Sequence, residues 1–176
     1  MEELKRLEEL TEMDEKHRLM GAICGAVPSS ERMHDVLSKE RLNGQVPEVI
    51  KSQFNVARNM ALYTYYFYAL APEVNLKTYT LIEHALKLKT KPEKHMMLAK
   101  LLRAALRNGW ISDAGFRHID NPSRDNEWCR AMLKSIPELR NSQAHGSSML
   151  IGDCIDHISI CADFINQLFP DDKSGQ

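Results

Sequence analysis

Apolar residues towards the end of the chain recur at intervals of four and three positions, the spacing that gives an α-helix one buried face. The series stops just before Pro170, which cannot continue a helix, and consists of Ile151, Ile155, Ile158, Ala162, Ile165 and Phe169. Similar spacing recurs upstream, and no segment alternates apolar and polar residues as a half-buried strand does. The sequence therefore predicts an all-α fold with a core of four helices.

The same periodicity predicts the helices that precede the last one. The expected segments are residues 47–71, 73–90, 93–108 and 122–136. Pro72 is expected to stop the first of these helices, because a proline inside a helix removes a hydrogen bond and clashes with the preceding turn. Pro137 is expected either in the first turn of a helix or at a kink.

Aromatic residues crowd the end of the long helix expected over residues 47–71. They are Tyr63, Tyr65, Tyr66, Phe67 and Tyr68. A run of this kind can act as a platform on which nucleic-acid bases stack. It can equally supply core contacts and a seam between two copies of the chain, and we favour this second interpretation because buried aromatic rings are the more common case.

The N-terminal region differs from the rest in having shorter segments and more charge. Residues 1–20 place leucine or methionine three positions apart and predict an amphipathic helix, and residues 21–28 form a break. A short helix from Glu31 to about Arg41 can be capped by Ser29 or Ser30. We therefore divide the chain into an N-terminal helical arm (1–45), a helical domain (46–170) and a disordered tail (171–176).

Composition narrows the class of protein. Hydrophobic residues make up 43% of the 176-residue chain and charged residues 27%, which is typical of a soluble globular protein. No apolar run is long enough for a membrane span, and the first residues do not resemble a signal peptide. The four cysteines lack CxxC spacing and the seven histidines lack metal-ligand spacing, so we expect a cytoplasmic protein without metal or cofactor.

The net charge of −1 excludes a protein that binds polyanions over its whole surface, but the charge is unevenly distributed. Residues 77–107 hold eight basic residues against two acidic ones. Candidates for RNA contacts in this segment are Lys87, Lys89, Lys91, Lys94, Lys100, Arg103 and Arg107. A basic patch can hold a phosphate backbone, whereas the alternative interpretation is an ordinary solvated helix face.

One short stretch combines the side chains that phosphodiester chemistry requires. It reads Leu-Arg-Asn-Ser-Gln-Ala-His-Gly over residues 139–146, so that Arg140, Asn141 and His145 lie within six positions. A fixed cation stabilises developing negative charge, and an imidazole exchanges protons near neutral pH. A structural alternative is that Arg140 pairs with Glu138 or Asp153, while His145 only stabilises the end of a helix.

The spacing of Arg140 and His145 constrains how they could act together. On an ideal helix, five positions place two side chains about 140° apart around the axis and about 7.5 Å apart along it. Such side chains reach one phosphate only if the helix breaks between them, or if a second chain brings its own pair to the same cleft. The sequence thus favours, without proving, a site at a dimer interface.

In this helical context the R-x4-H motif at Arg140 and His145, with Asn141 after the arginine, resembles the motif of the HEPN superfamily. The resemblance covers roughly residues 46–170. It implies an all-α, HEPN-like four-helix bundle core in which the motif lies between the last two helices, here with additional N-terminal helices.

The resemblance also implies an activity, namely a metal-independent endoribonuclease that works as a homodimer and leaves 2′,3′-cyclic phosphate ends. His145 would be the general acid or base, and Arg140 would bind the scissile phosphate. Asn141 would orient the histidine or the phosphate. Glu83 is a supporting candidate on an earlier helix. RNA would be the substrate, and an antitoxin or regulatory protein would be a partner if the chain belongs to toxin–antitoxin or phage-defence systems.

Members of this superfamily also exist that keep the fold without cleaving RNA. A second hypothesis is therefore a non-catalytic HEPN-like helical dimer that binds RNA, a nucleotide or a protein partner.

Overall fold

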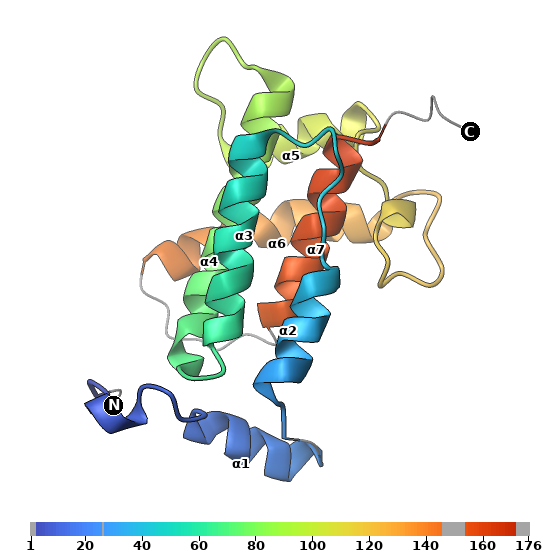
Figure 1. Ribbon diagram of the computed structural model, residues 1–176. Coiled ribbons are helices and arrows are strands. Elements are labelled where there is room, and N and C mark those ends of the chain that lie inside the picture. Colours follow the sequence, from blue (N-terminus) through green and yellow to red (C-terminus); the bar gives the residue numbers. More distant parts are fainter. Residues whose placement is uncertain (1–2, 26, 146–153, 172–176) are drawn as a thin grey trace.

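Helix α4 (Ala71–Thr90) lies at the centre of the fold and packs against α3, α5, α6 and α7. In the computed structural model, which describes residues 3–25, 27–145 and 154–171, α3 and α7 stand side by side and α6 crosses behind them (Figure 1). Helix α1 lies apart at one end of this assembly (Figure 1). A helix surrounded in this way must be apolar on most of its faces, and nine residues of α4 are buried.

Within the described residues the chain is helical and has no strand, which confirms the all-α prediction. The α-helices are α1 (Glu15–Cys24), α2 (Ser30–Lys39), α3 (Glu48–Tyr63), α4 (Ala71–Thr90), α5 (Leu98–Arg107), α6 (Glu127–Ala144) and α7 (Cys154–Leu168). Short 3₁₀ turns are η1 (Leu7–Glu9), η2 (Tyr68–Leu70) and η3 (Asp113–Gly115). None of the helices in the described part of the chain is both long and apolar enough to cross a membrane.

The core is formed where α4 meets α7. Leu81, Ile82 and Leu86 of α4 and Ile158 and Ile165 of α7 are almost completely buried. Burying each such side chain contributes about 1.5–3 kcal/mol relative to leaving it in water. Ile158, Ala162 and Ile165 of the last helix are therefore buried, as their spacing predicts, whereas Ile151 lies outside the described residues.

The single helix expected over residues 47–71 is two helices in the structure. Helix α3 ends at Tyr63, where the Thr64 hydroxyl donates to the Ala61 carbonyl at 2.6 Å, and α4 begins at Ala71. Pro72 therefore opens α4 and does not stop α3. In a first turn the missing N–H of proline has no cost, because those amides lack intrahelical partners.

Two other helices begin later than their spacing suggested. Helix α5 starts at Leu98 and not near residue 93, and α6 starts at Glu127 and not at Pro122. The start of α6 is tied to Asp113, a contact from another part of the chain that apolar spacing does not report.

The first twenty residues are not one helix. Asp14 interrupts them, because its side chain accepts a hydrogen bond from the Lys16 amide and a second from the amide of Tyr68. Helix α1 begins just after this cap. Helix α2, capped by Ser29, packs against α3 and buries Leu37 in the main core. Asp171 accepts from the Gly44 amide, and the remainder of the predicted tail, residues 172–176, lies outside the described residues.

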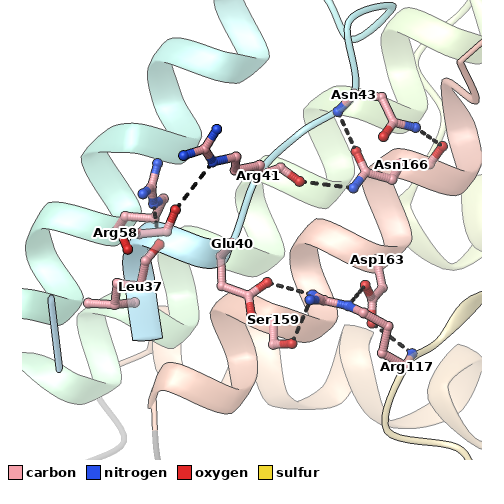
Figure 2. A network of polar contacts seen from close by, with 10 residues as sticks. Leu37, Glu40, Arg41, Asn43, Arg58, Arg117, Ser159, Asp163 and Asn166 are labelled. Atoms are coloured by element: carbon pink, nitrogen blue, oxygen red, sulfur yellow. Dashed lines mark hydrogen bonds and ion pairs between the residues drawn. The ribbon is translucent and has the colours of Figure 1, made fainter. Parts of the chain in front are cut away.

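Arg117 connects three parts of the chain (Figure 2). Its guanidinium donates to Asp163 of α7 at 2.6 Å, to Glu40 after α2 at 2.5 Å and to the Ser159 hydroxyl at 3.1 Å. The Arg117 amide also donates to Asp163. Both carboxylates are buried, so each would be costly without this partner. The hydrogen bonds to Glu40 and Asp163 raise the pKa of Arg117 and outweigh burial, which by itself would lower it.

Replacing Arg117 with methionine is expected to lower the free energy of unfolding by about 3 kcal/mol. That figure is the lower end of the range for breaking a buried ion pair, because the Arg117 side chain is 56% exposed and solvent screens part of the loss. Urea unfolding measures the difference. The exposed Arg124→Met variant is the control, and a loss below about 1 kcal/mol for Arg117→Met would contradict this account.

Candidate functional site

The helix that carries the motif, α6, is fixed at its start by a carboxylate from another segment. Asp113 of η3 accepts hydrogen bonds from the amides of Cys129, at 2.9 Å, and Trp128, at 3.2 Å. In return the Asn126 side chain accepts from the Asp113 amide at 2.9 Å. A negative group at this position pairs two otherwise unsatisfied amides and complements the positive end of the helix dipole.

The η3 turn is itself fixed against α7. The Ser112 amide donates to the Gln167 side chain at 2.8 Å, and a Cβ on Gly115 would come within 2.0 Å of Gln167. A side chain at position 115 would have to displace the end of the Gln167 side chain. Helix α7 thus positions the turn, and the turn positions the start of α6.

The pKa values of two ionisable groups at this junction differ from their usual values. Burial by itself would raise the pKa of Asp113, but the hydrogen bonds from Cys129 and Trp128 outweigh burial and hold the pKa below its usual value. Burial, together with the neighbouring Asp113 carboxylate, raises the pKa of the Cys129 thiol to about 12. Cys129 is therefore an uncharged core residue and not a nucleophile.

Helix α6 continues without interruption through the motif. Pro137 lies inside the helix, which runs on to Ala144, and His145 is the residue that ends it, with its amide donating to the Asn141 carbonyl at 3.0 Å. The chain therefore does not break between Arg140 and His145. A break in the helix between them, one of the two routes by which these side chains could reach one phosphate, is therefore absent from the described part of α6.

Glu83 of α4 lies beside Arg140 of α6. The Arg140 Nη2 atom is 3.5 Å from Glu83 Oε2, and Lys87 Nζ is 2.5 Å from Glu83 Oε1. The Glu83 side chain is only 15% exposed, whereas that of Arg140 is 36% exposed. One largely buried carboxylate thus pairs with an accessible arginine and with Lys87, the first of the candidates for RNA contacts. The alternative partner Asp153 lies outside the described residues.

The motif also contains polar atoms without hydrogen-bond partners. Arg140 Nε and both amide atoms of Gln143 are buried and have no hydrogen-bond partner among the described residues, and Gln143 is 7% exposed. The two residues are three positions apart, so they share a face of α6. Sequence reasoning overlooked Gln143, because a glutamine between Arg140 and His145 carries no signal of burial.

The other two motif residues face solvent. Asn141 accepts from Arg140 Nη1 at 3.3 Å, and both Asn141 and His145 are exposed. The structure therefore brings together Glu83, Arg140 and Asn141, and leaves His145 accessible at the end of the helix. Gly146, the last residue of the motif, lies outside the described residues.

The basic candidates fall into two groups. Lys87 pairs with Glu83, and Lys89 lies over the rings of Trp110 and Phe169 at 5.6 and 5.5 Å. The remaining candidates are exposed: Lys91, Lys94, Lys100, Arg103 and Arg107. These five charges lie on α5 and on the segment that leads into it, and are available to a polyanion.

Helix α1 contacts the aromatic residues that follow α3. The His17 ring stacks on Tyr65 and meets Tyr68 edge-on, and His17 Nε2 is 2.9 Å from the Thr64 carbonyl oxygen. Tyr63 remains largely exposed. The run therefore attaches the N-terminal region, a use that neither of the two earlier interpretations included.

A small pocket lies between α4, α6 and α7, next to the motif. Its volume is about 180 Å³, and Tyr79, Trp128, Leu139 and His157 contribute to its lining. Burial raises the pKa of Tyr79 to about 12. No group of three or more histidine, cysteine, aspartate or glutamate side chains in the described part of the chain is arranged to hold a metal ion.

In comparisons with known proteins, no protein-family model, curated protein or solved structure matches the chain.

The Asp113→Asn variant is expected to be less stable than the wild type at pH 7 by about 1–2 kcal/mol. Its NH₂ group would face an amide N–H that donates to a carboxylate in the wild type. The wild type should also lose stability in acid. Since the folded-state pKa of Asp113 lies below 3.8, its contribution is complete above that pH and disappears as the pH falls through the folded value.

Chemical unfolding of wild type and Asp113→Asn between pH 2 and pH 7 measures both effects. The variant should lack this part of the acid dependence, so the two curves converge at low pH. The control is Asp120→Asn, which alters an exposed carboxylate. Parallel curves for wild type and Asp113→Asn would contradict the assigned cap.

Proposed function

We propose that the chain is a metal-independent endoribonuclease of HEPN type that acts as a homodimer. The observation that supports this most is the pairing of Arg140 with Glu83 on a helix that ends in the exposed His145. A cation held by a largely buried carboxylate is oriented before any ligand arrives, which is what stabilising a phosphorane-like transition state requires.

The proposed chemistry needs no group that the chain lacks. The RNA 2′-oxygen attacks the adjacent phosphorus while the bond from phosphorus to the 5′-oxygen breaks. One proton leaves the 2′-hydroxyl and one is added to the departing 5′-oxygen, and His145 is suited to either transfer. Arg140 neutralises charge on the non-bridging oxygens, and the products carry a 2′,3′-cyclic phosphate and a 5′-hydroxyl.

We infer the dimer from the geometry of α6. The helix runs without a break from Arg140 to Ala144, and on an ideal helix Arg140 and His145 would point about 140° apart, which favours a phosphate shared between two chains. Two chains that place their α6 ends in a common cleft would bring together an arginine from one chain and a histidine from the other. The exposed bases near α5 would then extend the positive surface along the RNA.

One observation favours the alternative function, a helical dimer that binds RNA, a nucleotide or a protein without cleavage. Glu83 is shared by Arg140 and Lys87, so part of the arginine charge is already neutralised. Toxin–antitoxin and phage-defence roles, with an antitoxin or regulator as partner, belong to the catalytic hypothesis.

Incubation of the purified protein with labelled single-stranded RNA in EDTA separates the two functions. The catalytic proposal predicts cleavage with cyclic-phosphate ends, and at least a hundredfold loss of rate for His145→Ala, the usual size of a general acid or base contribution. His95→Ala, which removes another exposed histidine, should cleave like the wild type.

Circular dichroism establishes that both variants fold. Equal cleavage by wild type and His145→Ala would contradict the proposed role of the histidine. Absence of cleavage by a folded dimer, together with salt-dependent RNA binding that Lys100→Gln and Arg103→Gln weaken, would replace the nuclease by the binding protein.

A further inference from the structure

Two adjoining pockets lie in the groove between α2 and α3. One has a volume of about 400 Å³ and is lined by Ser38, Arg41, Leu42, Lys51, Phe54, Asn55 and Arg58. The other, of about 260 Å³, is lined by His34, Leu37, Ser38, Asn55, Arg58, Asn59 and Leu62. Arg58 lies where they join, and neither lining contains an acidic residue.

Arg58 is held rigidly by groups that do not cancel its charge. Its Nε donates to the Leu37 carbonyl at 2.9 Å, its Nη1 donates to Asn55 Oδ1 at 3.0 Å, and its guanidinium lies 6.0 Å from the centre of the Phe54 ring. All three partners are neutral. Among the described residues no carboxylate forms an ion pair with Arg58, in contrast to Arg117 and Arg140.

A second arginine extends into the same groove. Arg41 and Arg58 both line the larger of the two pockets, and Figure 2 shows both side chains next to the end of α2. Arg41 has one long contact, 3.5 Å from its Nε to the Ser38 carbonyl, and no carboxylate partner in the described part of the chain. Lys51 adds a third charge, which Glu48 offsets at 2.9 Å from outside the pocket lining. The groove therefore carries an excess of fixed positive charge.

We propose that this groove is a binding site for a phosphate group. A guanidinium offers two parallel N–H donors that match two phosphate oxygens, and two guanidiniums with unneutralised charge balance a phosphate dianion. The neighbouring pocket supplies the hydrogen-bonding side chains His34, Asn55 and Asn59 for the molecule to which the phosphate is attached. Pockets of a few hundred Å³ suit a ligand of nucleotide size.

This site is distinct from the motif on α6. It lies between α2 and α3 and shares no residue with the set around Arg140. The proposal does not depend on ribonuclease activity. The phosphate could belong to a free small molecule or to the backbone of an RNA chain, and these two sources make different predictions.

Isothermal titration calorimetry with inorganic phosphate, adenosine monophosphate and a 2′-O-methyl single-stranded RNA tests the site. The last ligand has no 2′-hydroxyl and cannot be cleaved, so its binding is independent of the proposed chemistry. Arg41→Gln is the main variant, because Arg41 is exposed and its replacement should not affect folding. Arg58→Lys keeps the charge of Arg58 but loses the paired donors.

The expected result is saturable binding of inorganic phosphate that weakens about tenfold in Arg41→Gln and in Arg58→Lys, as the loss of one charge-assisted hydrogen bond predicts. Arg124→Gln, which removes an equal charge from another exposed site, should bind like the wild type. Weakened binding of the 2′-O-methyl RNA in Arg41→Gln would assign the phosphate to RNA, and unchanged RNA binding would assign it to a small molecule.

Absence of saturable phosphate binding to the wild type would overturn the proposal. An equal loss in Arg41→Gln and Arg124→Gln would do the same, because it would reduce the effect to net charge.

Discussion

The arrangement depends on a single constraint, the burial of α4 by four other helices. Residues such as Leu81, Ile82 and Leu86 need apolar partners on several sides, and α3, α5, α6 and α7 supply them. A charged group that α4 carries into this environment needs a partner, since an unpaired buried charge is costly. Glu83 finds two, and one of them is Arg140 of the motif.

Pairing of buried carboxylates recurs at each junction of the structure. Asp113 is satisfied by amides at the start of α6, Asp14 by amides at the start of α1 and at Tyr68, and Asp163 by Arg117. Each carboxylate joins segments that are far apart in the sequence. Arg58 departs from this pattern, because its hydrogen-bond acceptors among the described residues are the neutral Leu37 carbonyl and Asn55 side chain, and this contrast supports a ligand in the α2–α3 groove.

Apolar spacing predicted the all-α class and the approximate positions of α4 and α7, because burial of one helix face is a local property of the sequence. It predicted that Pro72 ends a helix, whereas Pro72 lies in the first turn of α4, because a proline is compatible with either position. It could not find Asp113, Gln143 or Arg117, whose roles come from distant partners. Glu83 was a weak candidate, and the contact with Arg140 depends on how α4 and α6 pack.

The central functional claim is that an arginine from one chain and a histidine from another act on one phosphate. Mixing Arg140→Ala and His145→Ala subunits, each inactive alone, tests it directly. Exchange of subunits creates heterodimers in which one cleft holds an intact Arg140 from one chain and an intact His145 from the other. The account predicts that RNA cleavage in EDTA returns on mixing, towards half the wild-type rate per heterodimer. No recovery by a mixture shown to contain heterodimers would contradict it.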